Sequence, residues 1–214
     1  MKYKRGHLNC RTIKQREKII EKYDIEIITV ANLLKGRTMD SDAGGIIEDR
    51  YYEFRCTSKK NNLNKYTIIC GIIAGESLIR FAKIKDVIVF NPLKREYNID
   101  RCNNSVKCED YHKIKWDKTA KELFYAINIL EFYWKKSLNN TLYRVKKEIM
   151  VNRDKEPSLQ FIKKVNNCIA EDRTRLKISD MILKLREEDE RVRDFNFKNI
   201  NNILEKNNIE SNFS

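Results

Sequence analysis

Acidic side chains gather between residues 40 and 53, in and just before a segment that we expect to form a strand. Metal-dependent nucleases hold a divalent cation between such carboxylates. The order Glu53-Phe54-Arg55 fits this scheme, although a guanidinium cannot lose its proton and act as a base. The sequence is thus compatible with a small Mg²⁺-dependent endonuclease. The expected catalytic residues are Glu53, Asp42, Glu48 and Arg55, with Asp40 and Asp49 nearby. In a chain with 35% charged residues, scattered acids give the same pattern by chance.

Cysteine and histidine offer a second kind of site. The spacing C-x5-C-x3-H joins Cys102, Cys108 and His112, and either Cys56 or Cys70 would complete four ligands for a structural Zn²⁺ ion. This spacing is looser than that of most zinc knuckles. The alternative is that these thiols are reduced and buried, where cysteine behaves as a small apolar side chain.

Lysines surround the connection between two strand-like segments, residues 46–56 and 66–70. Alternation in the first segment places Tyr52, Phe54 and Cys56 on one buried face. The opposite face, which carries Glu53 and Arg55, is then expected to meet solvent. A basic hairpin tip is suited to phosphate contacts, so we expect nucleic acid to meet these residues: Arg55, Lys59, Lys60 and Lys65. A plain solvated loop is the alternative.

Two short amphipathic segments near the C-terminus, within residues 176–207, have the lengths of a helix-turn-helix motif. In that motif the second helix enters the major groove, where asparagine suits adenine and lysine suits guanine or phosphate. The residues expected to read DNA are Lys198, Asn199, Asn202 and Lys206. The alternative is a helical hairpin that closes a bundle, since the connection has no tight glycine turn.

The charge balance favours a polyanionic partner. The chain has 214 residues, 44 basic and 31 acidic, which gives a net charge of +13. Such an excess is typical of proteins that bind nucleic acid. Lysine, asparagine and isoleucine dominate, however, and their A/T-rich codons indicate that part of the excess reflects genome composition, as in a phage, plasmid or other mobile element.

Scarce glycine and proline, six and two residues, favour long helices over a many-stranded sandwich. Hydrophobic periodicity in the first half predicts helices at 12–23 and 72–84, and strands at 25–30, 46–56, 66–70 and 87–90. In the second half it predicts helices at about 117–151, from Pro157 onward, at 176–188 and at 197–206. The expected fold class is therefore α+β. A small mixed sheet with flanking helices would occupy residues 1–115, and a helical bundle on one long helix residues 116–214.

These features make a cytoplasmic nucleic-acid-binding protein the leading expectation, with DNA before RNA as the partner. No apolar segment is long enough to span a membrane, and residues 1–18 lack the apolar stretch of a signal peptide. The endonuclease is one alternative, and a protein–protein adaptor with incidental basic charge is another. The sequence leaves the oligomeric state, the metal content and the recognised site open.

Overall fold

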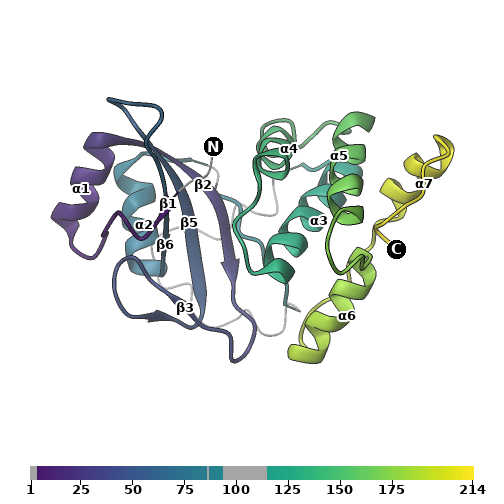
Figure 1. The fold of residues 1–214 in the computed structure, drawn as a ribbon, viewed down its shortest axis with the longest axis horizontal. Helices are drawn as coiled ribbons and strands as arrows, with labels where there is room; N and C mark the ends of the chain where they lie inside the picture. The colour runs from purple at the N-terminus through teal and green to yellow at the C-terminus, as the bar shows by residue number, and fades with distance from the viewer. Residues whose placement is uncertain (1–3, 86, 94–114) are drawn as a thin grey trace. The chain divides into compact units, whose positions relative to one another are not determined.

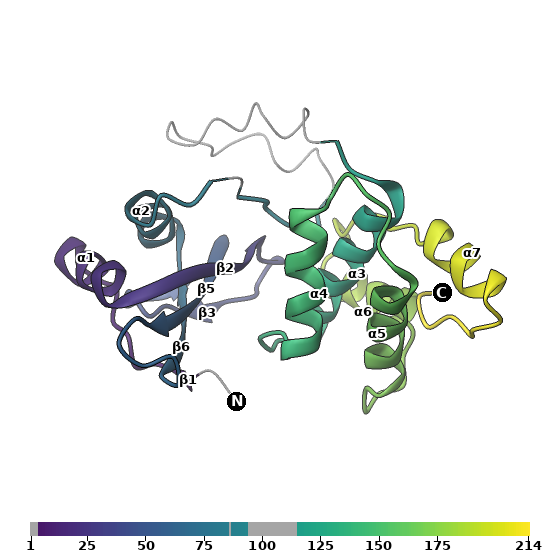
Figure 2. The same ribbon diagram turned by 90° about the horizontal axis from the view of Figure 1, so that it is seen from above.

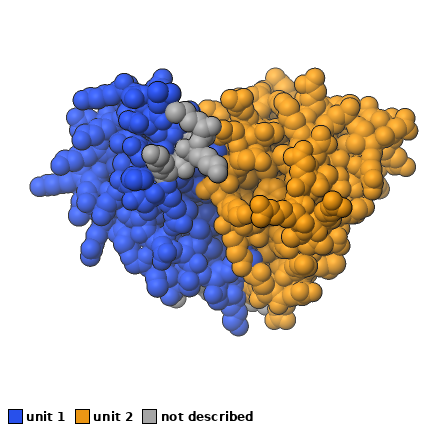
Figure 3. Space-filling view, viewed as in Figure 1, with its two compact units in different colours: residues 1–92 blue, residues 93–214 orange. Residues whose placement is uncertain are grey.

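The computed structural model describes residues 4–85, 87–93 and 115–214. The chain divides into two compact units, residues 1–92 and residues 93–214 (Figure 3). The first contains the strands and two helices, and the second contains five helices among the residues described. This arrangement confirms the predicted α+β class, with a small sheet in the N-terminal half and helices in the C-terminal half (Figure 1).

The main sheet of the first unit has four strands in the order β1-β6-β5-β2. Its strands are β1 (Lys4–Arg5), β2 (Tyr23–Asn32), β5 (Arg50–Ser58) and β6 (Lys65–Cys70). Strand β5 pairs antiparallel with both β2 and β6, whereas β1 pairs parallel with β6, so the sheet is mixed as expected. The predicted strand 46–56 is in fact two strands. Its first residues form β4 (Ile46–Ile47), which pairs with β3 (Met39–Asp40) in a separate two-stranded sheet.

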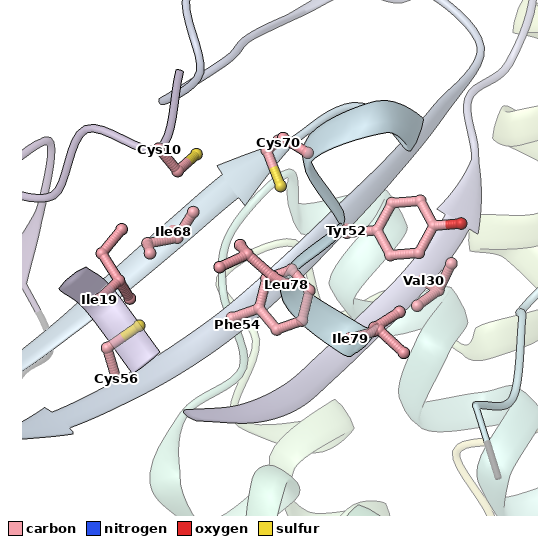
Figure 4. Close-up of a cluster of buried hydrophobic side chains, with 11 residues drawn as sticks. Cys10, Ile19, Val30, Tyr52, Phe54, Cys56, Ile68, Cys70, Leu78 and Ile79 are labelled. Carbon is pink, nitrogen blue, oxygen red and sulfur yellow. The ribbon is translucent and has the colours of Figure 1, made fainter. Parts of the chain in front are cut away.

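Helices α1 (Ile13–Lys22) and α2 (Ile72–Phe81) contribute to a core against one face of the sheet (Figure 2). Tyr52, Phe54 and Cys56 alternate onto this face, as predicted, and pack with Ile19 of α1 and Leu78 of α2 (Figure 4). Contact between α2 and β5 is close where α2 has a glycine. A Cβ atom at Gly75 would lie 2.3 Å from Cγ of Tyr52, so only glycine fits without movement of the ring.

The opposite face of β5 was expected to meet solvent, and this expectation is wrong. Tyr51, Glu53 and Arg55 are 5%, 3% and 5% exposed. Their neighbours in the sheet are also interior: Thr29 lies opposite Glu53 on β2, and Thr67 lies opposite Arg55 on β6. Alternation of polar and apolar residues shows which side chains share a face, but a charged side chain can still be buried where it has partners.

The second unit is built on α3 (Lys118–Trp134), most of whose residues are buried. Around it the chain forms α4 (Asn140–Val151), α5 (Leu159–Ala170), α6 (Ile178–Glu188) and α7 (Lys198–Lys206). Helix α3 packs with each of the other four. In the described part of the chain, no helix is both long enough and apolar enough to cross a membrane.

The single long helix predicted at 117–151 is two helices. It starts as expected, because the Asp117 carboxylate accepts a hydrogen bond from the Ala120 amide, 2.9 Å away. It ends at Trp134, since Lys135 adopts the left-handed conformation at φ 52°. Asn139 then caps α4 by accepting from the Leu142 amide at 2.8 Å. Leu138 in the connection is buried although it is not helical, so the apolar spacing continues through the break and conceals it in the sequence.

Candidate nucleic-acid interface

The turn between β5 and β6 is attached to the C-terminal end of α1. The Lys59 amide donates to the Lys22 carbonyl at 3.0 Å, and Lys59 Nζ donates to the Ile20 carbonyl at 2.8 Å. Carbonyls in the last turn of a helix have no partner within the helix, and cations are favoured there. These bonds bring together two basic segments that lie about 40 residues apart in the sequence (Figure 1).

The result is a group of exposed lysines that we name the basic face. Helix α1 contributes lysines spaced four residues apart, which puts them on one side of the helix with a rise of about 6 Å between neighbours. The attached turn adds two more beyond the C-terminal end of α1. The basic face consists of Lys14, Lys18, Lys22, Lys59 and Lys60, all of them exposed. Glu17 and Glu21 follow Lys14 and Lys18 by three residues, so they lie about 60° round the helix and border this row.

Helix α1 is a well-defined support for these lysines. Thr12 and Gln15 form a capping box. The Gln15 backbone amide donates to Thr12 Oγ1 at 3.2 Å, and the Thr12 backbone amide donates to Gln15 Oε1 at 2.8 Å. Such a cap stabilises the first turn by about 1 kcal/mol. On the inner side Ile19 is buried, and the Arg16 guanidinium donates to the Cys10 carbonyl at 3.3 Å.

The four residues expected at the hairpin tip fall into three groups. Lys59 and Lys60 are exposed in the basic face, whereas Lys65 is only half-buried at the start of β6. Arg55 lies in the interior, so it is not available to bind a phosphate on the surface. Sequence reasoning missed the three lysines of α1, although their spacing of four residues was visible and would have indicated a basic side on the predicted helix.

The tail helices do not have the geometry of a helix-turn-helix. Nine residues, 189–197, separate α6 from α7, whereas that motif uses a turn of about three or four. Both helices pack on α3. A long connection lets each helix pack on the central helix independently of the other. The apolar spacing within each segment is the same for a helix-turn-helix and for two helices of a bundle, so the sequence does not distinguish them.

Asn199, expected to read bases, is engaged inside the protein. Its side-chain amide donates to Glu122 Oε1 at 2.5 Å. The backbone amides of Asn199 and Ile200 donate to the same carboxylate at 3.3 and 3.0 Å. Glu122 of α3 is thus a cap for the first turn of α7, contributed by a distant part of the chain. Lys198, Asn202 and Lys206 remain exposed at spacings of four residues.

The acids of the nuclease hypothesis do not come together. Among the described residues, no three Asp, Glu, His or Cys side chains lie close enough to hold a metal ion. Asp42 has a structural role instead, since its carboxylate accepts from the Ile69 amide at 2.7 Å and its own amide donates to the Ile69 carbonyl at 2.8 Å. Glu53 is buried, whereas Asp40, Glu48 and Asp49 are exposed.

The cysteines of the zinc hypothesis are divided between two regions. Cys102, Cys108 and His112 lie outside the described residues. Cys56 and Cys70 face the same side of the sheet, but Cys56 lies opposite Tyr66 whereas Cys70 lies opposite Tyr52. Four residues along β5 correspond to about 13 Å, too far for both sulfurs to bind one zinc ion. Figure 4 shows the two side chains apart in the same core.

Burial controls the chemistry of these thiols. Burial first, and then the negative charges of Cys10 and Asp42, raise the pKa of Cys56 to about 12. A hydrogen bond between the thiols of Cys10 and Cys70 lowers the pKa of Cys10 and raises that of Cys70. All three side chains are completely buried, as expected for thiols that act as small apolar groups.

No protein-family model, no curated protein and no solved structure matches this chain.

Proposed function

We propose that the protein binds nucleic acid, DNA before RNA, through the basic face. The observation that carries this proposal is the attachment of the β5–β6 turn to the end of α1, which adds Lys59 and Lys60 to the row formed by Lys14, Lys18 and Lys22. Five ammonium groups on two joined elements form a positive surface larger than either element has alone. The net charge of +13 adds a long-range attraction for a polyanion.

The chemistry of the basic face suits the sugar–phosphate backbone more than the base edges. Each lysine presents a single ammonium group, which binds phosphate oxygens as a point charge. Sequence readout depends more on paired donors and acceptors, such as arginine to guanine or asparagine to adenine. The proposed binding is therefore largely independent of sequence, and its affinity depends on salt because bound counterions are released.

A comparison of two triple variants tests the proposal. The first, Lys14→Gln/Lys18→Gln/Lys22→Gln, removes three charges from the basic face. The second, Lys155→Gln/Lys163→Gln/Lys184→Gln, removes three exposed charges from the other unit and so matches the change in net charge. Fluorescence anisotropy with a labelled 20-base-pair duplex at 50 mM salt measures the affinity, and circular dichroism confirms that both variants fold.

The first variant should bind at least tenfold more weakly than wild type, because three of five expected phosphate contacts are gone. The second should lose much less, since only the long-range attraction changes. Equal losses in the two variants would contradict a role for the basic face, and absence of wild-type binding would overturn the proposed function. A duplex RNA of the same sequence tests the preference for DNA.

A further inference from the structure

Three aromatic rings lie beside the basic face, at the end of the sheet where the β5–β6 turn joins α1. The rings of His7 and Tyr66 have centroids 5.6 Å apart, and those of Tyr23 and Tyr66 have centroids 5.7 Å apart. Tyr23 and Tyr66 meet edge to face at an interplanar angle of 83°. We name these three residues the aromatic trio. His7 is exposed, and both tyrosines are half-buried.

The backbone places the aromatic trio next to the lysines. Tyr23 directly follows Lys22 and is the residue at which α1 ends and β2 begins. In the sheet Tyr23 lies opposite Ser58, the residue before Lys59. Tyr66 lies one residue after Lys65, on the strand that leaves the same turn. Each tyrosine therefore has a lysine of this turn, or of the end of α1, as a close neighbour.

The sheet register puts both tyrosines on the same face. Tyr66 lies opposite Cys56, and Cys56 lies opposite Ile25 on β2, two residues from Tyr23. This is the face that α1 and α2 cover further along the sheet. Burial first, and then Tyr66, raise the pKa of the Tyr23 hydroxyl, so Tyr23 is a neutral ring with a polar edge at ordinary pH.

We infer that the aromatic trio stacks on an unpaired base while the basic face holds the phosphates beside it, so that the protein also binds single-stranded nucleic acid. This inference rests on the proposed function, because the lysines supply most of the affinity. Proteins that bind single strands combine these two elements, a positive surface that follows the backbone and aromatic side chains that stack on bases. In an intact duplex the bases are already stacked and cannot reach the rings.

The experiment compares single-stranded and duplex DNA with the same variants. Labelled oligo-dT of 20 nucleotides and a 20-base-pair duplex are titrated with wild type and with His7→Ala/Tyr23→Leu, which removes two rings and changes none of the lysines. Tyr66 stays, because its ring contacts both of the others. Since Tyr23 packs against the core as Tyr66 does, circular dichroism confirms that the variant folds. A first control, Tyr23→Phe, retains the ring. A second control, Tyr133→Leu, removes a half-buried tyrosine from the other unit.

We expect His7→Ala/Tyr23→Leu to bind oligo-dT roughly 5- to 160-fold more weakly, which corresponds to the loss of about 1 to 3 kcal/mol of stacking on one base. Duplex affinity should change less than twofold, and both controls should bind like wild type. Equal losses on both polymers, or unchanged affinity for oligo-dT, would overturn the inference and leave the proposed function standing. If wild type binds neither polymer at 50 mM salt, the proposed function itself fails.

Discussion

The cap that Glu122 provides for α7 yields a quantitative prediction. Glu122 is 8% exposed, and its carboxylate accepts hydrogen bonds from two backbone amides and one side-chain amide at the start of α7. A helix cap contributes about 1 to 2 kcal/mol, and a hydrogen bond to a charged group about 1.5 to 3 kcal/mol. These contributions overlap, so we expect Glu122→Ala to lower the free energy of unfolding by about 3 kcal/mol. Glu122→Gln keeps one acceptor oxygen and should cost about 1 kcal/mol.

Urea denaturation followed by circular dichroism measures this loss. Hydrogen exchange adds a local readout, because the amides of Asn199 and Ile200 should exchange faster in Glu122→Ala. Asn202→Ala is the control, since that side chain is exposed on the same helix and its removal should change stability by less than about 0.5 kcal/mol. A loss below 1 kcal/mol for Glu122→Ala, with unchanged exchange in α7, would refute the cap.

Three further predictions concern the cores. Gly75→Ala should destabilise the protein by about 2 kcal/mol in urea denaturation, because the new methyl group meets the Tyr52 ring, and Tyr52→Leu should reduce this loss. Lys146→Met should lower the free energy of unfolding by about 3 kcal/mol, since Lys146 Nζ lies 3.4 Å from buried Glu131 and 2.7 Å from Asn128. The double variant Lys146→Met/Glu131→Leu should lose less stability, because no buried charge is left unpaired. An equal loss in the two variants would argue against the ion pair. With its pKa raised from 9.0 to about 12, Cys56 should resist alkylation at pH 8.5 in peptide mapping. Because burial favours the protonated thiol, the contribution of Cys56 to stability should fall as the pH rises from about 9 to 12. Cys56→Ala should lack this part of the pH dependence.

The sequence predicted elements well where local signals are strong. Thr12 and Gln15 mark the start of α1, and Asp117 marks the start of α3. These are contacts between near neighbours in the chain, so residue type and spacing are enough to find them. The break at Lys135 was missed although Asn139 offers a cap of the same kind for α4, because the apolar spacing continues through the break.

The candidate site was predicted only in part, because it depends on contacts between distant segments. Lys59 and Lys60 were recognised as a basic tip, but their attachment to the end of α1 depends on hydrogen bonds across about 40 residues. Glu122 and Asn199 are even further apart in the sequence. The burial of Glu53 and Arg55 is likewise a tertiary property, since the alternation that places them on one face does not reveal what covers that face.

The salt dependence of duplex DNA binding tests the central claim most directly. If all five lysines of the basic face contact phosphates, log affinity should fall against log salt with a slope of about −4.5, a loss of roughly 500-fold between 50 and 200 mM. In Lys14→Gln/Lys18→Gln/Lys22→Gln the slope should shrink to about −2, because three counterions are no longer released. A slope that stays the same in this variant, or wild-type affinity that does not depend on salt, would contradict binding through the basic face.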